Sequence, residues 1–185
     1  VLSQRYAVNP ANPLPDGHGT CFGYEVHVAD LDGDDVVELI TSDSRDRVFV
    51  FRSPSYDLFD LVPKPPTTQG NPSGETAYGY ALGAADVNAD GYMDVLIGDP
   101  FDGDLTGCAI GPGGVLLAAL GPYLHTFHRV IDPAPACEDD FGWSLASGDV
   151  DGDGRVEVLV GVDTADHAGI FNAGHVVVFD LGGSQ

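Results

Sequence analysis

Residues 141–145 and 149–159 read FGWSL and DVDGDGRVEVL, and this pair of segments decides the fold because the chain carries two earlier copies of it. In every copy the aromatic residue lies eight positions before the first aspartate, and the three copies begin at Phe22, Tyr78 and Phe141. A sequence that repeats at such regular intervals indicates a row of similar structural units. The earlier copies are FGYEV with DLDGDDVVELI (22–26 and 30–40) and YGYAL with DVNADGYMDVL (78–82 and 86–96).

Each repeat contains short apolar runs rich in β-branched residues, the pattern of strands buried on both faces. One run follows each aspartate-rich segment, at residues 36–41, 93–98 and 156–161. A further run comes later in each repeat, at residues 48–51, 115–120 and 176–179, and outer strands are predicted at 58–62 and 125–130. The 25 glycines and 13 prolines break any long helix and mark turns between these strands.

Units of about 60 residues with four strands each are typical of β-propeller blades. We therefore predict an all-β fold, a partial propeller in which residues 1–185 form one segment with three blades of four antiparallel strands. The predicted blades span residues 21–62, 78–130 and 141–181, and the third has no outer strand of its own. Residues 4–8 form a strand candidate before a proline-rich linker, so we expect the segment 1–20 to complete a last blade.

The aspartate-rich segments place oxygen-bearing side chains at positions 1, 3, 5 and 9 of each loop, and position 7 offers a backbone carbonyl. Alternate residues of a tight loop point their oxygens at a common centre. Calcium, a hard cation that takes about six to eight oxygen ligands, suits this arrangement. We predict three Ca²⁺ ions per chain, held by Asp30, Asp32, Asp34, Val36 and Glu38; by Asp86, Asn88, Asp90, Tyr92 and Asp94; and by Asp149, Asp151, Asp153, Arg155 and Glu157.

Other interpretations of these loops agree less well with the sequence. An EF-hand requires flanking helices and a glutamate at position 12, where this chain has Thr41, Ile97 and Val160 in predicted strands. Magnesium resists exchanging its water ligands for a cage made of protein. A solvated turn rich in Asp and Gly explains one such loop, but not three copies in the same frame.

The three loops are not equivalent. A sharp turn at positions 4 and 6 requires a positive φ angle, which glycine adopts most easily. The third loop has Gly152 and Gly154 there, whereas the first has Asp35 at position 6 and the second has Ala89 at position 4. The formal charges at the ligand positions are −4, −3 and −4 in chain order. We expect the third site to bind calcium most tightly, and binding to be coupled to folding.

The charge balance limits the partners of the chain. Seven Lys and Arg stand against 29 Asp and Glu, and the formal net charge of −22 argues against binding to nucleic acid or anionic lipid. The longest apolar run, residues 115–120, is too short to insert across a membrane. Cys21, Cys108 and Cys137 have no zinc-type spacing, and we expect Cys108 and Cys137, both in loops between repeats, to form a disulfide.

These repeats resemble the FG-GAP repeat of integrin α-subunit β-propellers, which also occurs in bacterial surface proteins. The aromatic-Gly pairs correspond to FG, and Ile97-Gly98-Asp99-Pro100 is close to the terminal GAP. The third repeat keeps Gly161 but continues with Val162-Asp163, and the first has Ser42-Asp43-Ser44. In integrins the resemblance implies a seven-bladed extracellular propeller that acts in adhesion. Its calcium loops lie on the face opposite the one that binds ligand and the β-subunit.

Two classes of function follow. The favoured one is a calcium-stabilised module, secreted or at the cell surface, that binds a protein or glycan and is not an enzyme. The alternative is a propeller domain of a secreted enzyme, but no nucleophile with a neighbouring base supports catalysis, so no catalytic or cofactor-binding residues are assigned. Three blades cannot close a ring and leave sheet surface exposed. We expect either a longer propeller or a homodimer with six blades, in which each N-terminal strand completes the partner's third blade.

Overall fold

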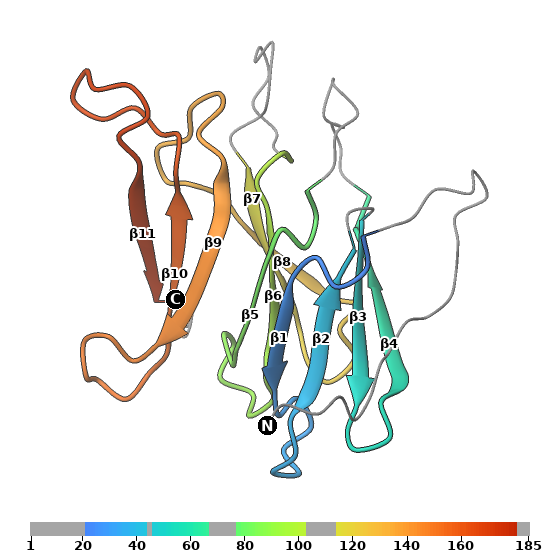
Figure 1. Cartoon of the computed structure of the whole chain (residues 1–185). Helices are drawn as coiled ribbons and strands as arrows, with labels where there is room; N and C mark the ends of the chain where they lie inside the picture. The colour runs from blue at the N-terminus through green and yellow to red at the C-terminus, as the bar shows by residue number, and fades with distance from the viewer. Residues whose placement is uncertain (1–20, 44–45, 67–76, 103–113, 181–185) are drawn as a thin grey trace, which may run out of the picture.

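The computed structural model describes residues 21–43, 46–66, 77–102 and 114–180, which form three antiparallel sheets side by side (Figure 1). The first sheet contains β1 (Val26–Ala29), β2 (Glu38–Ser42), β3 (Arg47–Arg52) and β4 (Asp57–Pro63). The second contains β5 (Ala81–Ala85), β6 (Asp94–Asp99), β7 (Val115–Ala119) and β8 (Phe127–Val130). The third contains β9 (Phe141–Gly148), β10 (Glu157–Val162) and β11 (His175–Asp180). The described segments contain strands and turns but no helix, so none offers a helix that could span a membrane.

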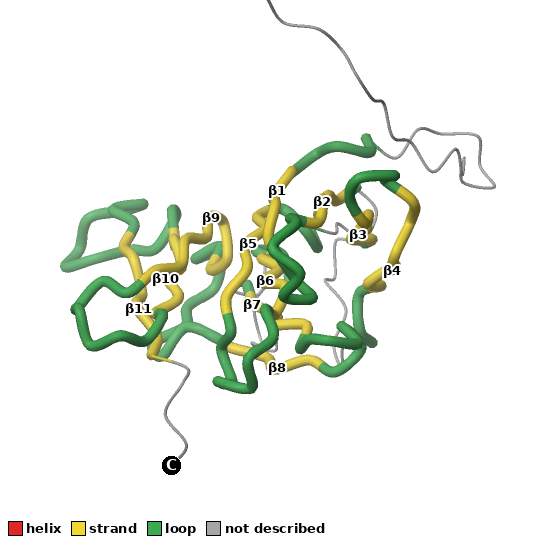
Figure 2. The backbone as a smooth tube through the Cα atoms, turned by 90° about the horizontal axis from the view of Figure 1, so that it is seen from below, coloured by secondary structure: helices red, strands yellow, loops and turns green. Residues whose placement is uncertain are grey.

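Strand order within each sheet follows the chain, so every strand pairs with its neighbours in sequence. The first strand of each sheet begins at or shortly after an aromatic-Gly pair, and the second begins at the last residue of the aspartate-rich loop. β5 packs against both β1 and β9, which places the first strands of the three sheets next to one another (Figure 2). The all-β fold with antiparallel sheets of four, four and three strands agrees with the prediction.

Two hydrophobic clusters hold the three sheets together. The first lies between the first and second sheets and joins Ile40 and Val50 to Ile97. The second lies between the second and third sheets and joins Leu96 to Val160. Successive side chains of a strand point to opposite faces. Neighbouring residues of β6 therefore pack alternately into the first and the second cluster. Every residue of β6 and β7 is buried, so the middle sheet forms the centre of the core.

The outer sheets overturn part of the expectation that the apolar runs form strands buried on both faces, because the run at residues 176–179 lies in β11. Val176 and Val178 of β11 are 61% and 51% exposed. On the first sheet, Val26 and Val28 of β1 are each 55% exposed. Only the middle sheet has a neighbour on each side among the described residues, so the outer sheets each show one apolar face to solvent.

The connections at the two ends of the sheets differ in regularity. Eight residues join the first strand to the second in all three sheets, and these are the aspartate-rich loops. At the opposite end, the second strand is joined to the third by residues 43–46, 100–114 and 163–174 in chain order. The first set of connections therefore has a fixed length, whereas the second set does not.

A buried ion pair links the first sheet to the second at this opposite end. The Lys64 ammonium lies 2.7 Å from Asp99 and 3.3 Å from Asp102. Burial raises the pKa of Asp99 to about 6, although the charge of Lys64 acts in the other direction. The residue that follows β4 thus contacts both the last residue of β6 and the connection after it.

Several sequence predictions concern residues beyond the described segments. Cys137 is disulfide-bonded and Cys21 is a free, exposed thiol, while the predicted partner Cys108 lies outside the described residues. The strand predicted at residues 4–8 lies outside them as well. β11 pairs only with β10 among the described strands, so the third sheet shows no outer strand there.

The glycine of the aromatic-Gly pair brings neighbouring sheets close together. Gly142 has a φ of +95°, and a Cβ atom there would lie 2.7 Å from the carbonyl oxygen of Val115 in the second sheet. Gly79 has a φ of +81°, and its Cβ would lie 2.6 Å from the Cβ of Ser42 in the first sheet. Both the left-handed backbone and the close approach require glycine.

We expect Gly142→Ala to lower the free energy of unfolding by about 2–4 kcal/mol, because it adds left-handed strain to a backbone clash between sheets. Urea unfolding followed by circular dichroism measures this change. Gly148→Ala is the matched control, since a Cβ at Gly148 meets no atom of the described segments within 4 Å and its φ is not positive. Equal losses in the two variants would contradict the role assigned to the close approach.

Candidate metal centres

The three aspartate-rich loops lie at the same end of the three sheets (Figure 1). Each one joins a first strand to a second strand: β1 to β2, β5 to β6 and β9 to β10. Position 1 of the loop directly follows the first strand, and position 9 is the first residue of the second strand. The loop acids are therefore held between two paired strands.

Backbone N–H groups fix the carboxylate at position 1. Asp30 accepts hydrogen bonds from the amides of Gly33, Asp34 and Asp35 at 2.7–3.1 Å. The corresponding Asp149 accepts from Gly152 at 2.6 Å and from Gly154 at 3.0 Å. In the second loop the equivalent bonds run from Asp90 (3.1 Å) and Gly91 (2.9 Å) to Asp86.

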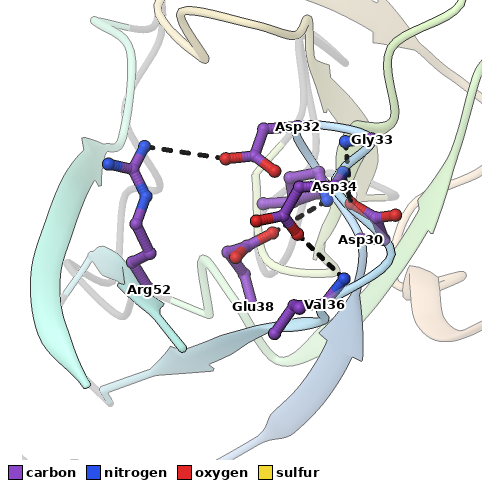
Figure 3. A network of polar contacts seen from close by, with 8 residues as sticks. Asp30, Asp32, Gly33, Asp34, Val36, Glu38 and Arg52 are labelled. Atoms are coloured by element: carbon purple, nitrogen blue, oxygen red, sulfur yellow. Dashed lines mark hydrogen bonds and ion pairs between the residues drawn. The ribbon is translucent and has the colours of Figure 1, made fainter. Parts of the chain in front are cut away.

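In every loop the carboxylate at position 5 accepts a hydrogen bond from the backbone amide at position 7. Asp34 accepts a hydrogen bond from the Val36 amide at 2.8 Å (Figure 3). The matching distances to the amides of Tyr92 and Arg155 are both 2.9 Å. These are side-chain-to-backbone turns of the kind that Asp forms readily. The residue predicted to offer its carbonyl is thus anchored through its N–H.

Positions 4 and 6 have positive φ in all three loops, as expected from the sequence. In the third loop both are glycine, with φ of +82° and +89°. Asp35 at position 6 of the first loop has φ +67°, and Ala89 at position 4 of the second has φ +58°. Alanine has no polar group that compensates for this conformation, so the second loop carries the least favourable backbone.

The acid at position 9 is buried and bonded across the loop. Glu38 accepts the Leu31 amide at 3.0 Å, and Glu157 accepts the Val150 amide at 2.8 Å. Burial raises the pKa of Glu38, and the charges of Asp32, Asp34 and Asp30 add to the rise, while the Leu31 hydrogen bond opposes it. The carboxylate of Glu38 is thus disfavoured in its charged form both by burial and by the neighbouring aspartates.

In the first and third loops the acid oxygens converge. Ligand atoms of Asp30, Asp32 and Glu38 all lie within 4.8 Å of one another, and the same holds for Asp149, Asp151 and Glu157. These sets contain only hard oxygen donors and an excess of negative charge, so a hard divalent cation such as Ca²⁺ fits them. In each of these two loops the convergent group contains the acids at positions 1, 3 and 9 but not the predicted position 5 ligand, Asp34 or Asp153.

The second loop is arranged differently: position 3 is the neutral Asn88, and position 9 is Asp94, which is one methylene shorter than glutamate. This buried carboxylate accepts the Val87 amide through Oδ2 at 2.9 Å and the Gly121 amide through Oδ1 at 2.8 Å. Asn88 donates its side-chain N–H to Asp90 at 2.9 Å. Among the described residues, the acids of this loop do not form a convergent group of three like those in the other two loops.

Sequence analysis did not identify Arg52, the last residue of β3, as part of the first site. Its guanidinium lies 3.7 Å from Asp32 Oδ2 (Figure 3). β3 runs antiparallel to β2, so the end of β3 returns to the loop end of the sheet. That topology, together with the basic residue at the strand end, is the signal that could have located it.

We expect Ala89→Gly to raise the free energy of unfolding by about 0.5–1 kcal/mol. The relief of left-handed strain exceeds the entropy that glycine adds to the unfolded chain. Urea unfolding in EDTA measures the change without bound calcium. Ala173→Gly is the control, because Ala173 is exposed without positive φ and the substitution should be neutral or destabilising. A loss of stability in Ala89→Gly would contradict the strain at position 4.

Comparison with known proteins identifies a family match and related sequences. Residues 141–179, which contain the whole third loop, match the family model described as FG-GAP repeat. The chain is 30% identical over 169 residues to integrin alpha-7 of Mus musculus, an alignment that covers 82% of this chain and 13% of that protein. It is 27% identical over 183 residues to integrin alpha-PS5 of Drosophila melanogaster, covering 86% of this chain and 16% of that protein.

The similarity therefore extends over most of this chain, although the chain spans only a small fraction of the length of these relatives. A further relative, integrin alpha-PS3 of Drosophila melanogaster, is 28% identical over 180 residues and is covered to 15% of its length. The chain contains an FG-GAP repeat and is a homologue of integrin alpha subunits over most of its length.

Proposed function

We propose that this chain is a calcium-binding segment of an integrin-like β-propeller that mediates adhesion outside the cell. The observation that carries the proposal is the convergence of three acid side chains in the first and third loops. Each group joins the residue after a first strand to the first residue of a second strand. A divalent ion there would bridge two paired strands and relieve the repulsion among the carboxylates.

The proposal extends to three ions, although the loops differ in their geometry. The second loop has the same carboxylate-to-amide turns as the others. Both oxygens of Asp94 already accept an N–H, but each carboxylate oxygen has a second lone pair that can bind a metal. We propose that calcium binds the third loop most tightly and the second loop most weakly.

We expect calcium to raise the melting temperature of the wild-type chain. In Asp151→Asn this calcium-induced increase should be smaller. Each occupied site contributes about 2.7 kcal/mol when free calcium is 100 times the Kd. An asparagine side chain can still accept the hydrogen bond from the Asp153 amide that Asp151 accepts now. A smaller calcium-induced shift would therefore reflect the lost charge of the ligand. Differential scanning fluorimetry in EDTA and in calcium measures the shift.

Asp166→Asn is the matched control, because it removes one exposed charge outside the three loops and can keep its hydrogen bond from Asn172. This variant should retain the full calcium shift of the wild-type chain. Identical melting curves of the wild-type chain in EDTA and in calcium would overturn the proposed function.

The homology to integrin alpha chains supports a place in the extracellular region of a cell-surface protein. We propose that the segment presents loops to a protein or glycan partner and does not catalyse a reaction. The connections of unequal length, opposite the acidic loops, are the surface best suited to this role. Loops on a rigid scaffold commonly carry binding residues, and their lengths vary more than those of the elements they connect.

We also propose that a second copy of the chain covers the two open sheet faces and completes a six-bladed ring. The exposed valines of β1 and β11 lie on these faces and support the proposal. Gly23 supports it as well: its equivalents Gly79 and Gly142 press against the preceding sheet, whereas a Cβ at Gly23 meets none of the described residues within 4 Å. A further sheet in that space would repeat the packing found twice within the chain.

Light scattering in calcium at micromolar protein should give twice the chain mass of 19.3 kDa. Val28→Lys should reduce the mass to that of one chain, because it places a charge on an open face. Tyr123→Lys is the control, since Tyr123 lies in the turn between β7 and β8 of the middle sheet and is 78% exposed. A monomeric wild-type chain would contradict the dimer and leave the calcium proposal unaffected.

A further inference from the structure

Arg52 is held close to the first loop by a second contact. Its guanidinium carbon lies 4.1 Å from the centroid of the Phe59 ring on β4, within the range of a cation–π interaction. Its Nη2 lies 3.7 Å from Asp32 Oδ2, and Figure 3 shows the side chain directed toward the loop acids. Asp32 belongs to the convergent group with Asp30 and Glu38. A fixed positive charge therefore stands beside the predicted ligands.

The third loop has a basic residue as well, but its charge is directed elsewhere. Arg155 occupies position 7, and its Nη1 lies 3.8 Å from Asp180 Oδ2 at the end of β11. Asp180 is outside the group formed by Asp149, Asp151 and Glu157. Two loops of similar acidity thus differ in whether a guanidinium contacts one of their convergent carboxylates.

We propose that Arg52 is a tethered cation that competes with the divalent ion at the first loop, an inference that rests on the proposed calcium binding. The guanidinium attracts Asp32 when no ion is bound and repels an incoming Ca²⁺. The Phe59 contact keeps the guanidinium near the loop, so it need not be recruited from solvent. Calcium consequently binds the first loop more weakly than the third.

The competition has opposite effects on the two states of the loop. Without calcium, Arg52 neutralises part of the charge that Asp30, Asp32, Asp34 and Glu38 bring together, and so stabilises the empty loop. With calcium, the same charge weakens binding. The pair is half-exposed, so solvent and salt screen it and the effect on affinity is moderate, about three- to tenfold.

The experiment is a calcium titration of the chain labelled with ¹⁵N-glycine, followed by NMR. The amides of Gly33 and Gly152 bond to the position 1 carboxylates of the first and third loops and so report each site separately. Arg52→Gln should lower the Kd reported by Gly33 about three- to tenfold. The Kd reported by Gly152 should stay within about twofold, and the melting temperature in EDTA should fall.

Two further variants separate charge competition from other effects. Arg52→Lys keeps the charge, so the Kd at Gly33 should stay within about twofold of wild type. Arg155→Gln keeps the backbone carbonyl predicted as a ligand and removes only a guanidinium that contacts Asp180, so it should change the Kd at Gly152 less than Arg52→Gln changes the Kd at Gly33. Equal changes would overturn the inference in favour of a general loss of charge.

Other outcomes distinguish this inference from the proposed function. An unchanged Kd at Gly33 in Arg52→Gln, with normal calcium shifts in the wild-type chain, would overturn only the role of Arg52. The role of Arg52 is also overturned if Arg52→Lys behaves like Arg52→Gln. If neither Gly33 nor Gly152 of the wild-type chain shifts with calcium, the proposed calcium binding itself is wrong.

Discussion

The crowding of carboxylates into loops of eight residues is the constraint on which this structure depends. Each loop joins the first strand of a sheet to the second. Acids that repel one another are therefore held at the connection that brings these two strands together. Backbone N–H groups supply part of the compensation, since the carboxylates at positions 1, 5 and 9 all accept amide hydrogen bonds. These donors fix the direction of the oxygens but carry no net charge. The loops therefore keep an excess of negative charge that the amides alone do not neutralise.

The packing of the sheets follows from the same repeat. Each unit places its first strand next to the corresponding strand of its neighbour, and the glycine of the aromatic-Gly pair permits the close approach. The middle sheet then shares its side chains between two clusters, one on each face. A sheet with only one neighbouring sheet has a hydrophobic cluster on only one of its faces. Its other face is exposed, which explains the exposed valines on β1 and β11. Burial in this fold depends on the position of a sheet in the row.

Much of this could be predicted from the sequence because the determinants are local and repeated. The apolar runs located the second, third and outer strands, and the choice of residues in the third loop indicated positive φ at positions 4 and 6. Contacts between segments far apart in sequence could not be predicted. The approach of Arg52 to Asp32 depends on the path of β3. Aspartate and glutamate at position 9 are equal in the motif, but Asp94 is shorter by one methylene and is engaged by Gly121 of the β7–β8 turn. The ligand type was visible in the sequence, whereas its surroundings were not.

The contrast between the two ends of the sheets has a consequence for how such chains can diversify. Connections of one length recur without exception at the acidic end, whereas those at the other end differ from sheet to sheet. An insertion at the acidic end would separate carboxylates that now converge, whereas an insertion at the far end would leave their spacing unchanged. The connections at the far end can therefore vary in length while the spacing of the acidic side chains stays the same, which separates the variable part of this fold from the constant part.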